Sequence, residues 1–527
     1  MPIKHPKGVK KGTEHSLRYM DKIGVHTATQ AKESLLLELS KFVSEKKPMF
    51  ADFRFEASEG TYAEAINGNS KSAGKDYGIA LGVRVFAGKE MVAGGFAGTS
   101  LGPSHVGKEK DALKKLLEEA EKKARINSEE KYARKEGARG IYSTKLAAMP
   151  QIKAEKTKKF TKTPLDANIE DFVKRSEGIS KETAKIAGVA TNAITIVSAL
   201  TRKIYGNSEG SLIEQTRAIT EPSIYIAAKG KAQETYHEWL CDAKGLEVLE
   251  GDNPHKKTLE DFAEFIAKGT VELSNAPAMK PQKNVAVVTD PWFNTLVSHE
   301  VCGHPLEADR ALKRETAWAG RAWWFNNLED NLRGKSIGSE EMTVASDPGM
   351  GGYGNYDFDD EGVAGKRVLN IKKGVLCEFM NSRETSLILG EAPNGHMRAH
   401  SASAMPLIRM STTYFEKGSW KHEELIEDTK DGYYIVGEKT PSIGESRQNF
   451  NITCWKAYKI ENGEIGQLYR QAGVEANSNE YFKTLEAADD VKIYNVPNCG
   501  KGTPMQTMRL SNGGPHMRGI ANVTGKR

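Results

Sequence analysis

The sequence predicts an α+β protein of two domains, an N-terminal antiparallel sheet with helices and a mostly β C-terminal domain that carries a histidine-bearing helix. Three observations predict this class. The chain has 527 residues, which is more than one hydrophobic core usually supports. Its first half contains runs of alternating apolar and polar residues beside amphipathic helical segments. Its second half contains mainly strand and hairpin signals.

The composition is typical of a globular protein, with 28% charged and 38% hydrophobic residues and a mean hydropathy of −0.54. No apolar run approaches the roughly eighteen residues of a membrane helix, and the N-terminal segment MPIKHPKGVKKG lacks the apolar core of a secretory signal. We therefore expect a cytoplasmic protein without a membrane partner. The formal charge of +5 is small for this length and the lysines alternate with acids, so we expect no nucleic-acid partner.

The cysteines argue against a disulfide framework or a zinc ribbon. They are odd in number, widely spaced and without a C-x-x-C pair, and each one by itself favours a buried apolar side chain over a ligand. They are Cys241, Cys302, Cys377, Cys454 and Cys499.

The elements of the first domain follow in order along the chain. Residues 31–46 have leucines at helical spacing and predict an amphipathic helix. FADFRFEASEG, residues 50–60, and the apolar–polar alternation of residues 77–100 predict antiparallel strands. Residues 194–230 return to β-branched residues, with the turn NSEG between two runs, and predict more of the same sheet.

A stretch of about 108–185, rich in Lys, Glu and Ala, interrupts this sheet and is interpreted as a charged helical insertion. One apolar stripe marks a solvated helix that lies over the domain, rather than a basic binding surface. Residues 154–172 are predicted to be an exposed connection into a helix. A helix over LEDFAEFIAKGTVELSN, residues 259–275, precedes a Pro-rich passage. We place the domains at 1–280 and 281–527.

The second domain begins with the strand VAVVT, and Asp290-Pro291 after it suits the N-cap and first position of a helix. Beyond that helix the pattern is mostly β. Hairpin turns are predicted at Lys372-Lys373-Gly374 and at Asn462-Gly463.

The predicted helix contains HEVCGH, in which His299 and His304 stand five residues apart. On an undistorted helix this spacing rotates the two imidazoles by roughly 140°, too far to bind one ion. They converge if the helix contains a π-bulge or a tighter turn. Gly303 permits distorted backbone, and Pro305 removes a downstream helical hydrogen bond. Glu300 then stands beside the metal as a candidate proton acceptor.

A catalytic zinc site needs a third protein ligand and an open position for water. The residues themselves leave several candidates open. They are Cys302 within the motif, Glu307 one turn later, His396 and His400 in NGHMRAH, and Cys499 in NVPNCGKGTPMQ. The acidic segment YDFDDEG, residues 356–362, lacks the ligand spacing of an EF-hand, so a structural turn is predicted there rather than a calcium site.

Several motifs in a fixed order carry a family resemblance. HEVCGHPLEAD, FDDEGVAGKRVLNIKKGVL, NGHMRAH and NCGKGTPMQ follow one another in the second half, and FADFRFEASEG and YGNSEGSLIEQTR stand in the first. Together they resemble the TldD/PmbA (TldD/TldE) metalloprotease family over roughly 50–105 and 190–520. The ordered set is far more specific than any single motif.

The resemblance implies a zinc-dependent metallopeptidase that hydrolyses short or unfolded peptides. It implies His299, His304 and Cys499 as Zn²⁺ ligands and Glu300 as general base on a zinc-bound water. Arg398 is a candidate substrate contact, because the family has basic residues in this region. Family members assemble as dimers, so we expect a homodimer or a heterodimer with a TldE/PmbA-like subunit, with this chain as the catalytic, TldD-like subunit.

Two departures and two rival functions accompany this prediction. The charged stretch at 108–185 is longer than the family leads one to expect, and PSIGESRQNFNITCW, residues 441–455, stands where relatives tend to have a Gly-rich strand end. The rivals are a zinc hydrolase of a non-peptide amide and a non-catalytic subunit braced by zinc.

Overall fold

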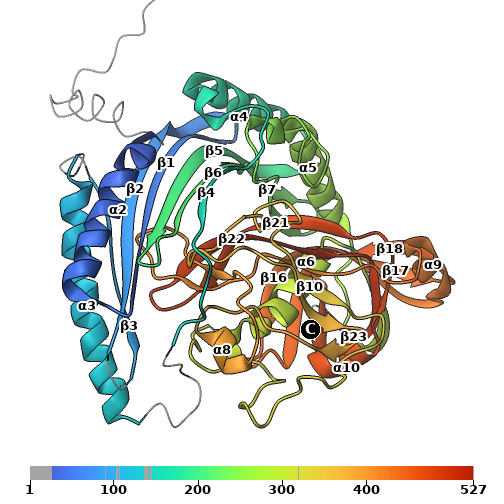
Figure 1. Ribbon diagram of the computed structural model, residues 1–527. Coiled ribbons are helices and arrows are strands. Elements are labelled where there is room, and N and C mark those ends of the chain that lie inside the picture. The colour runs from blue at the N-terminus through green and yellow to red at the C-terminus, as the bar shows by residue number, and fades with distance from the viewer. Residues whose placement is uncertain are drawn as a thin grey trace, which may run out of the picture.

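The computed structural model describes residues 26–88, 91–102, 105, 107–135, 142, 145–318 and 320–525. The chain forms the predicted α+β fold, with a curved N-terminal sheet on one side and a β-rich C-terminal part on the other (Figure 1). None of the helices in these residues is both long enough and apolar enough to cross a membrane.

The N-terminal sheet is built around two very long strands. Its path runs β3-β2-β1-β5-β6-β4, and β7 and β8 extend it from β5. The alternation in FADFRFEASEG explains β1, because Phe53 and Phe55 point into the core and are fully buried. Asn67 and Gly68, both at positive φ, form the tight turn into β2. The strands are β1 Phe50–Ile66, β2 Asn69–Ala87, β3 Ala93–Ser100, β4 Lys153–Thr157, β5 Val189–Asn207, β6 Leu212–Thr220, β7 Ser223–Lys229 and β8 Gln233–Trp239.

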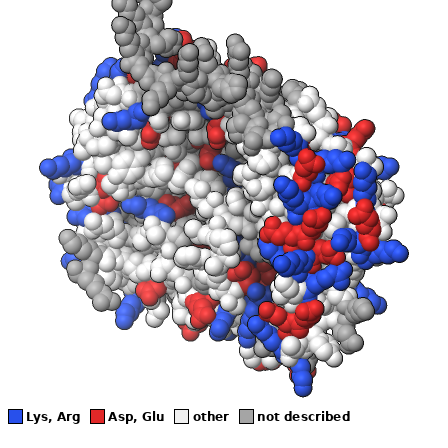
Figure 2. Space-filling model, turned by 90° about the vertical axis from the view of Figure 1, so that its left-hand side faces the viewer, with Lys and Arg blue, Asp and Glu red and all other residues white. Residues whose placement is uncertain are grey.

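Helices cover the convex side of this sheet, so its concave side faces the C-terminal part (Figure 1). Leu35 of α2 and Leu117 of α3 belong to the same core cluster as Phe53 and Phe55. On the face that these two helices cover, basic and acidic side chains intermingle (Figure 2), which fits the predicted solvated helix rather than a basic surface. The N-terminal helices are α2 His26–Lys46, α3 Glu109–Ala133, α4 Ile169–Ala184 and α5 Leu259–Asn275, with short turns η3 Pro164–Asp166 and η4 Leu246–Leu249.

One prediction for this domain is wrong in part. The segment 154–172 was expected to be an exposed connection only, yet its beginning lies in β4, which pairs in parallel with the edge strand β6. The strand KAEKT is polar and mostly exposed. It therefore lacks the alternation that identifies a half-buried strand, and backbone pairing alone determines it.

The C-terminal part contains two large sheets, with the histidine-bearing helix between them, and the two-stranded sheet β13-β14. One follows the order β12-β11-β10-β15-β22-β21; the other follows β16-β9-β23-β19-β17-β18, with β20 on β23, and an extra β16–β17 pairing closes it. The strands are β9 Gln282–Thr289, β10 Val344–Ser346, β11 Val368–Lys372, β12 Val375–Leu376, β13 Met397–Arg398, β14 Leu407–Ile408, β15 Thr412–Phe415, β16 Asp431–Ile443, β17 Asn449–Glu461, β18 Glu464–Tyr469, β19 Gly473–Asn477, β20 Glu486–Ala487, β21 Lys492–Lys501, β22 Gln506–Gly514 and β23 Met517–Thr524.

Short helices connect these strands, and both predicted hairpins are present. Asn462 and Gly463 have positive φ between β17 and β18, and Lys373 and Gly374 have positive φ between β11 and β12. The helices and turns are α6 Asn294–Leu296, η5 Val297–Gly303, η6 His304–Leu306, α7 Ala308–Ala311, α8 Thr385–Leu389, α9 His422–Asp428 and α10 Ser478–Lys483. The boundary near residue 280 stays a prediction; it falls between the end of α5 and the start of β9.

The two parts contact each other through aromatic packing and buried ion pairs. Tyr236 of β8 stacks on Trp455 of β17 with ring centroids 4.7 Å apart. The acidic segment predicted to be a structural turn supplies the charges. Arg84 of β2 lies 2.9 Å from Glu361, and Lys203 of β5 lies 3.1 Å from Asp360. This contact fixes the concave side of the N-terminal sheet against the domain that holds the histidines.

Candidate metal centre

The helix that carries HEVCGH is distorted, as its sequence predicts. Asp290 Oδ1 accepts a hydrogen bond of 2.7 Å from Phe293 N and caps its start. After one α-helical turn the chain forms the π-helix η5, and the backbone N–H of His304 donates to the carbonyl of His299, five residues earlier. A 3-10 turn containing Pro305 follows. Because a π-turn spans five residues, it brings His299 and His304 to the same side of the helix.

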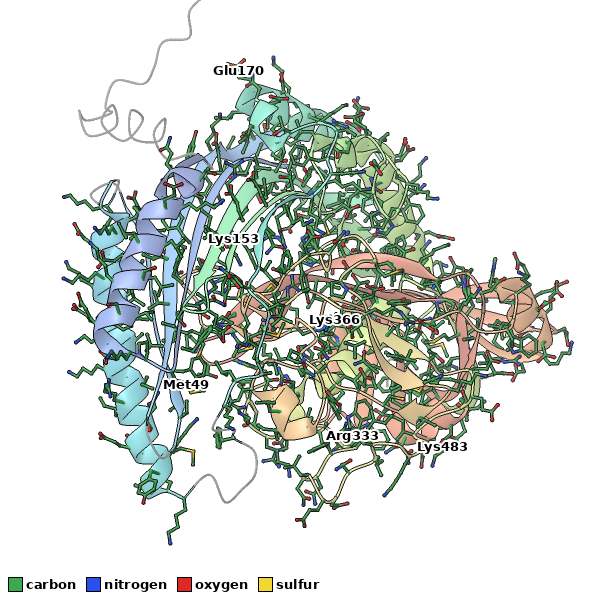
Figure 3. The ribbon with its side chains drawn as sticks, viewed as in Figure 1. Met49, Lys153, Glu170, Arg333, Lys366 and Lys483 are labelled. Carbon is green, nitrogen blue, oxygen red and sulfur yellow. The ribbon has the colours of Figure 1, made fainter. Side chains whose placement is uncertain are left out.

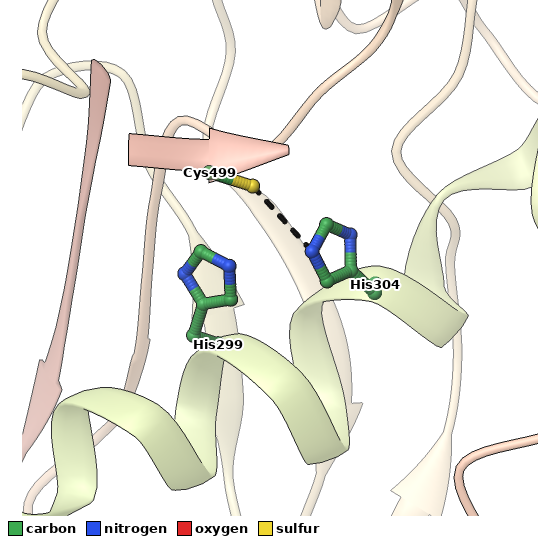
Figure 4. A group of neighbouring side chains, drawn as sticks. All are labelled: His299, His304 and Cys499. Atoms are coloured by element: carbon green, nitrogen blue, oxygen red, sulfur yellow. Dashed lines mark hydrogen bonds between the residues drawn. The ribbon is translucent and has the colours of Figure 1, made fainter. Parts of the chain in front are cut away.

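Cys499 reaches the two imidazoles from a strand that lies across the helix (Figure 4). Its Sγ is 3.4 Å from His304 Nε2, and the potential ligand atoms of His299, His304 and Cys499 all lie within 4.8 Å of one another. Neighbouring N and S ligands of a tetrahedral zinc ion stand about 3.5 Å apart. All three residues are buried. The donor set and its spacing therefore fit zinc.

Hydrogen bonds behind the imidazoles fix which nitrogen faces the centre. His299 Nδ1 is 2.9 Å from Asn512 Oδ1, and His304 Nδ1 is 3.0 Å from Glu307 Oε2. Both rings therefore direct Nε2 toward Cys499, with an angle of 81° between their planes. Partners of this kind orient metal-binding histidines and raise their basicity.

Gly303 has a different role from the predicted one. Its φ of −61° and ψ of −54° are ordinary helical values that any residue adopts, so backbone freedom is not the reason for glycine. A Cβ atom at this position would instead lie 2.0 Å from Sδ of Met410. The glycine allows β15 and its preceding loop to pack directly against the π-helix.

Glu300 lies at the rim of the centre and is held by an arginine. Its Oε1 is 3.8 Å from His299 Nε2, and its Oε2 accepts a hydrogen bond from Arg447 Nη1. Arg447 also donates to the carbonyls of Glu300 and Trp318, at 3.2 and 3.3 Å. One carboxylate oxygen is thus anchored while the other faces the histidines.

The charges of these groups are strongly coupled. Burial would raise the pKa of Cys499, but the two imidazoles lower it well below its usual value, so the group is a thiolate. Burial would lower the pKa of His299, but the thiolate raises it to about 9 in the protein without metal. Burial also opposes ionisation of Glu300, yet Arg447 and then the histidines lower its pKa to about 2. The centre therefore contains two anionic groups, Cys499 and Glu300, that favour the binding of a cation.

The other candidate ligands lie outside the cluster. Cys302 is fully buried in the apolar core, where desolvation raises its pKa. Glu307 accepts hydrogen bonds from His304, Lys501 and Arg310, so it supports a ligand instead of being one. Burial opposes ionisation of Glu307, yet the charge of Lys501, followed by His304 and Arg310, holds its pKa well below its usual value.

The pair in NGHMRAH serves the surrounding structure. His396 is buried between Asn394 and Ser411, and desolvation lowers its pKa to about 3. His400 Nδ1 lies 3.3 Å from Gln506 Oε1. Arg398 is buried and donates to the carbonyl of Met410 at 2.7 Å. It faces an inter-domain cavity and does not touch the three donors.

Sequence reasoning missed two residues that shape the centre. Asn512 stands on β22, more than two hundred residues after His299, and no local pattern connects the two. Arg447 lies in the segment 441–455, which the sequence distinguished only as a departure from the family. That departure was the only signal in the sequence. In the structure Arg447 has a positive φ, which is uncommon for arginine.

The chain is similar to several known proteins. The PmbA/TldA metallopeptidase C-terminal domain profile matches residues 282–523. A protein of Methanocaldococcus jannaschii named a metalloprotease is 28% identical over 485 residues, which cover 90% of this chain and 97% of that one. A Saccharolobus solfataricus protein named a zinc metalloprotease TldD homolog is 34% identical over 236 residues, or 44% of this chain and 49% of that one.

Solved structures share the fold across both domains. TldE from Thermococcus kodakarensis superposes with a TM-score of 0.63 at 18% identity, covering 93% of this chain and all of that one. A Thermotoga maritima protein superposes with a TM-score of 0.68 at 15% identity and the same coverage. Together with the ordered motifs and the C-terminal domain match, these relatives lead to one conclusion. The C-terminal domain of the chain, residues 282–523, belongs to the PmbA/TldA metallopeptidase family.

Proposed function

We propose that this chain is a zinc-dependent metallopeptidase that hydrolyses short or unfolded peptides, with Glu300 as general base. The observation that carries the proposal is the convergence of two imidazoles and one thiolate within 4.8 Å across a π-helical turn. Two nitrogens and one sulfur suit zinc better than the hard cations that prefer oxygen. The metalloprotease names of several relatives support the reaction class.

His299, His304 and Cys499 would hold the ion. When bound, zinc acts as a Lewis acid that polarises water and the scissile carbonyl. Asn512 and Glu307 keep both rings in the orientation that binding needs. The three protein ligands leave a fourth position for water or substrate.

Glu300 performs the proton transfers in this proposal. It accepts a proton as the water oxygen attacks the carbonyl carbon, and it returns that proton to the amine nitrogen as the C–N bond breaks. Arg447 holds one carboxylate oxygen in place, so the free oxygen performs the chemistry. The low pKa that Arg447 imposes keeps Glu300 ionised throughout the neutral range.

Partners and location extend the proposal. We propose a dimer, either of this chain or with a TldE/PmbA-like subunit; light scattering of the purified chain, alone and with such a subunit, distinguishes the two. The cytoplasmic location expected from the sequence stays a prediction.

The test compares zinc content and cleavage of quenched extended peptides in Glu300→Gln and wild type. We expect Glu300→Gln to keep its zinc and to lose about 10²–10⁴-fold in rate, the usual contribution of a general base. Glu445→Gln is the matched control, because this exposed carboxylate stands two residues from Arg447 and pairs only with Arg321 among the described residues.

Three outcomes contradict the proposal in different ways. Wild-type cleavage by Glu300→Gln would show that another group is the base. Uncut peptides with rapid hydrolysis of small amides would favour the non-peptide hydrolase. Bound zinc without hydrolysis of either substrate would favour the braced subunit.

A further inference from the structure

A cavity of about 320 Å³ lies between the concave face of the N-terminal sheet and the C-terminal domain. Strands β1, β4, β5 and β6 form one wall, and the segment 355–360 with parts of β13 and β22 forms the other. In Figure 3, Lys153 of β4 and Lys366 of the C-terminal domain mark the two sides of this boundary. The metal centre does not line the cavity, so its chemistry is separate.

Two of the three lysines that line this cavity have acidic partners close by. Lys203 lies 3.4 Å from Glu56 and 3.1 Å from Asp360. Lys158 lies 2.8 Å from Asp357. These pairs neutralise both lysines, and the third lysine, Lys156, is exposed at the edge of the cavity.

Three arginines also line the cavity. Of these, only Arg509 has an ion pair with a described residue, with its Nε 2.7 Å from Glu221 Oε2. Arg398 is 5% exposed and donates only to two backbone carbonyls, while its guanidinium lies 4.6 Å from the ring centroid of Tyr356. These contacts orient the guanidinium without forming an ion pair.

Arg217 of β6 is the least satisfied of the three. Its guanidinium has no hydrogen bond or ion pair with any residue that the structure describes. Burial, followed by the positive charges of Arg398 and Arg509, lowers the pKa of Arg217 to about 10. At neutral pH it is still charged, so the cavity contains two guanidinium groups without an ion pair among the described residues, and Glu56 and Asp360 act on them only from a distance.

A buried charge without a counter-charge is costly, and guanidinium groups bind carboxylates with paired, charge-assisted hydrogen bonds. The same end of the cavity includes the apolar side chains Ile219 and Met508. This combination suits an organic acid with apolar neighbours. We propose that Arg217 and Arg398 bind the carboxylate of a peptide in this cavity. That the ligand is a peptide rests on the proposed function; that it offers a carboxylate rests on the cavity alone.

The cavity also connects to the metal centre through shared structure. Arg398 donates to the carbonyl of Met410, whose sulfur packs against Gly303 of the metal-binding helix. His400 lines both this cavity and a second one of about 550 Å³ that reaches Gly502, three residues after Cys499. The second cavity therefore lies beside the turn that follows the strand of Cys499.

The experiment measures peptide binding by calorimetry in the full-length zinc-loaded Glu300→Gln protein, so that no cleavage interferes. The probes are acetyl-Ala-Ala-Ala with a free C-terminus, the same peptide as its amide, and acetyl-Ala-Glu-Ala-amide. We expect the neutral amide to bind at least about tenfold more weakly than one of the two acids. Tighter binding of acetyl-Ala-Ala-Ala would identify the C-terminal carboxylate as the bound group. Tighter binding of acetyl-Ala-Glu-Ala-amide would identify an acidic side chain.

Variants of the cavity then test the arginines. Arg217→Gln is expected to abolish the preference for the acid, and Arg217→Lys to retain part of it because the charge remains without the fork. Lys156→Gln removes a cation from the exposed edge of the same cavity and is expected to keep the preference. Thermal unfolding checks that each variant folds.

Two results overturn the inference without touching the proposed function. One is equal binding of all three probes; the other is an unchanged acid preference in a folded Arg217→Gln. Conversely, acid-specific binding by a wild-type protein that cuts no peptide would contradict the peptidase and leave the carboxylate site standing.

Discussion

Two groups of three donor side chains occur in the described part of the chain, and proximity does not distinguish them. One is the metal centre. The other, the α9 cluster, consists of His422, Asp490 and His516 near the start of α9. In each group the potential ligand atoms lie within 4.8 Å of one another. The metal centre is completely buried, whereas His422 in the α9 cluster has a side chain that is 38% exposed.

The two groups differ in where their lone pairs point. In the metal centre each Nδ1 has a partner outside the group, which leaves both Nε2 atoms free to converge. In the α9 cluster His516 uses both nitrogens, Nδ1 with Asp490 at 2.7 Å and Nε2 with Tyr434 at 3.0 Å. Its ring also stacks on His422 with only 17° between the planes.

Stacked rings cannot share an ion, because a metal lies near the plane of each imidazole that binds it. The edge-to-face rings of the metal centre satisfy this requirement, with 81° between them. The comparison teaches that a metal site is identified by unoccupied lone pairs with a common target and by partners that hold them there. Donor distance alone selects both groups.

Removing one histidine from each group gives the largest expected contrast. His304→Gln is expected to lose both zinc and peptide cleavage, and Cys499→Ser to do the same, because each removes a ligand. His516→Gln is the matched substitution in the α9 cluster and is expected to keep about one zinc ion per chain. Metal analysis after dialysis, with cleavage assays on the same samples, provides the measurement. Zinc retained by Cys499→Ser would rule out the sulfur as a ligand.

The helical half of the metal centre was predictable from its sequence. Histidines five residues apart in HEVCGH do not converge on a regular helix, and Pro305 marks the point where regular hydrogen bonding stops. The structure resolves the distortion into a π-turn and a 3-10 turn. The reason for Gly303 was not predictable, because it depends on Met410 from a distant segment.

The strand half was not predictable from spacing. Cys499 reaches the centre from β21, where the register with β22 shifts between Val496 and Cys499. A register shift of this kind decides which side chains face the helix, and it cannot be predicted from a single sequence. Only the family resemblance selected Cys499 over Cys302. The same limitation explains β4, whose polar residues gave no strand signal.

The pH dependence of zinc binding sharpens the contrast further. In the metal-free protein the pKa of His299 is raised to about 9, so zinc must displace its proton at any lower pH. Apparent affinity is therefore expected to rise with pH by about tenfold per unit, or about a hundredfold from pH 6 to pH 8. Competition with a zinc chelator of known pH behaviour measures this slope. A flat profile would show that no ligand carries a proton in this range.

Removing a partner behind the ligands should have a smaller effect than removing a ligand. Asn512→Ala deletes the acceptor of His299 Nδ1 while leaving all three donors in place. Zinc affinity is expected to fall by about 10–100-fold. Because Asn512 also donates to the carbonyl of Thr413, the urea midpoint must be measured alongside to separate affinity from folding.

An unchanged zinc affinity in Asn512→Ala would show that the backbone of the π-helix, rather than Asn512, orients the ring of His299. The π-turn would then be sufficient to aim both rings, and the hydrogen bonds behind them would serve folding only. Gly303→Ala acts on the helix and on Asn512 together, because the added Cβ displaces Met410 Sδ, which accepts a hydrogen bond from Asn512 Nδ2 at 3.9 Å. A loss of zinc affinity in Gly303→Ala, with an unchanged affinity in Asn512→Ala, would show that the π-helix orients the rings.

The smallest effect is expected in the α9 cluster itself. His422 is partly exposed, and its contacts are carboxylates in solvent reach, with Nε2 3.0 Å from Glu423 Oε1. Such surface pairs contribute little, so His422→Ala is expected to change the free energy of unfolding by no more than about 0.5 kcal/mol. Urea unfolding with and without excess zinc measures it. Stabilisation of the wild type by a second zinc equivalent that His422→Ala abolishes would mean that stacked rings can reorganise around an ion, and burial would then become the only distinction between the two groups.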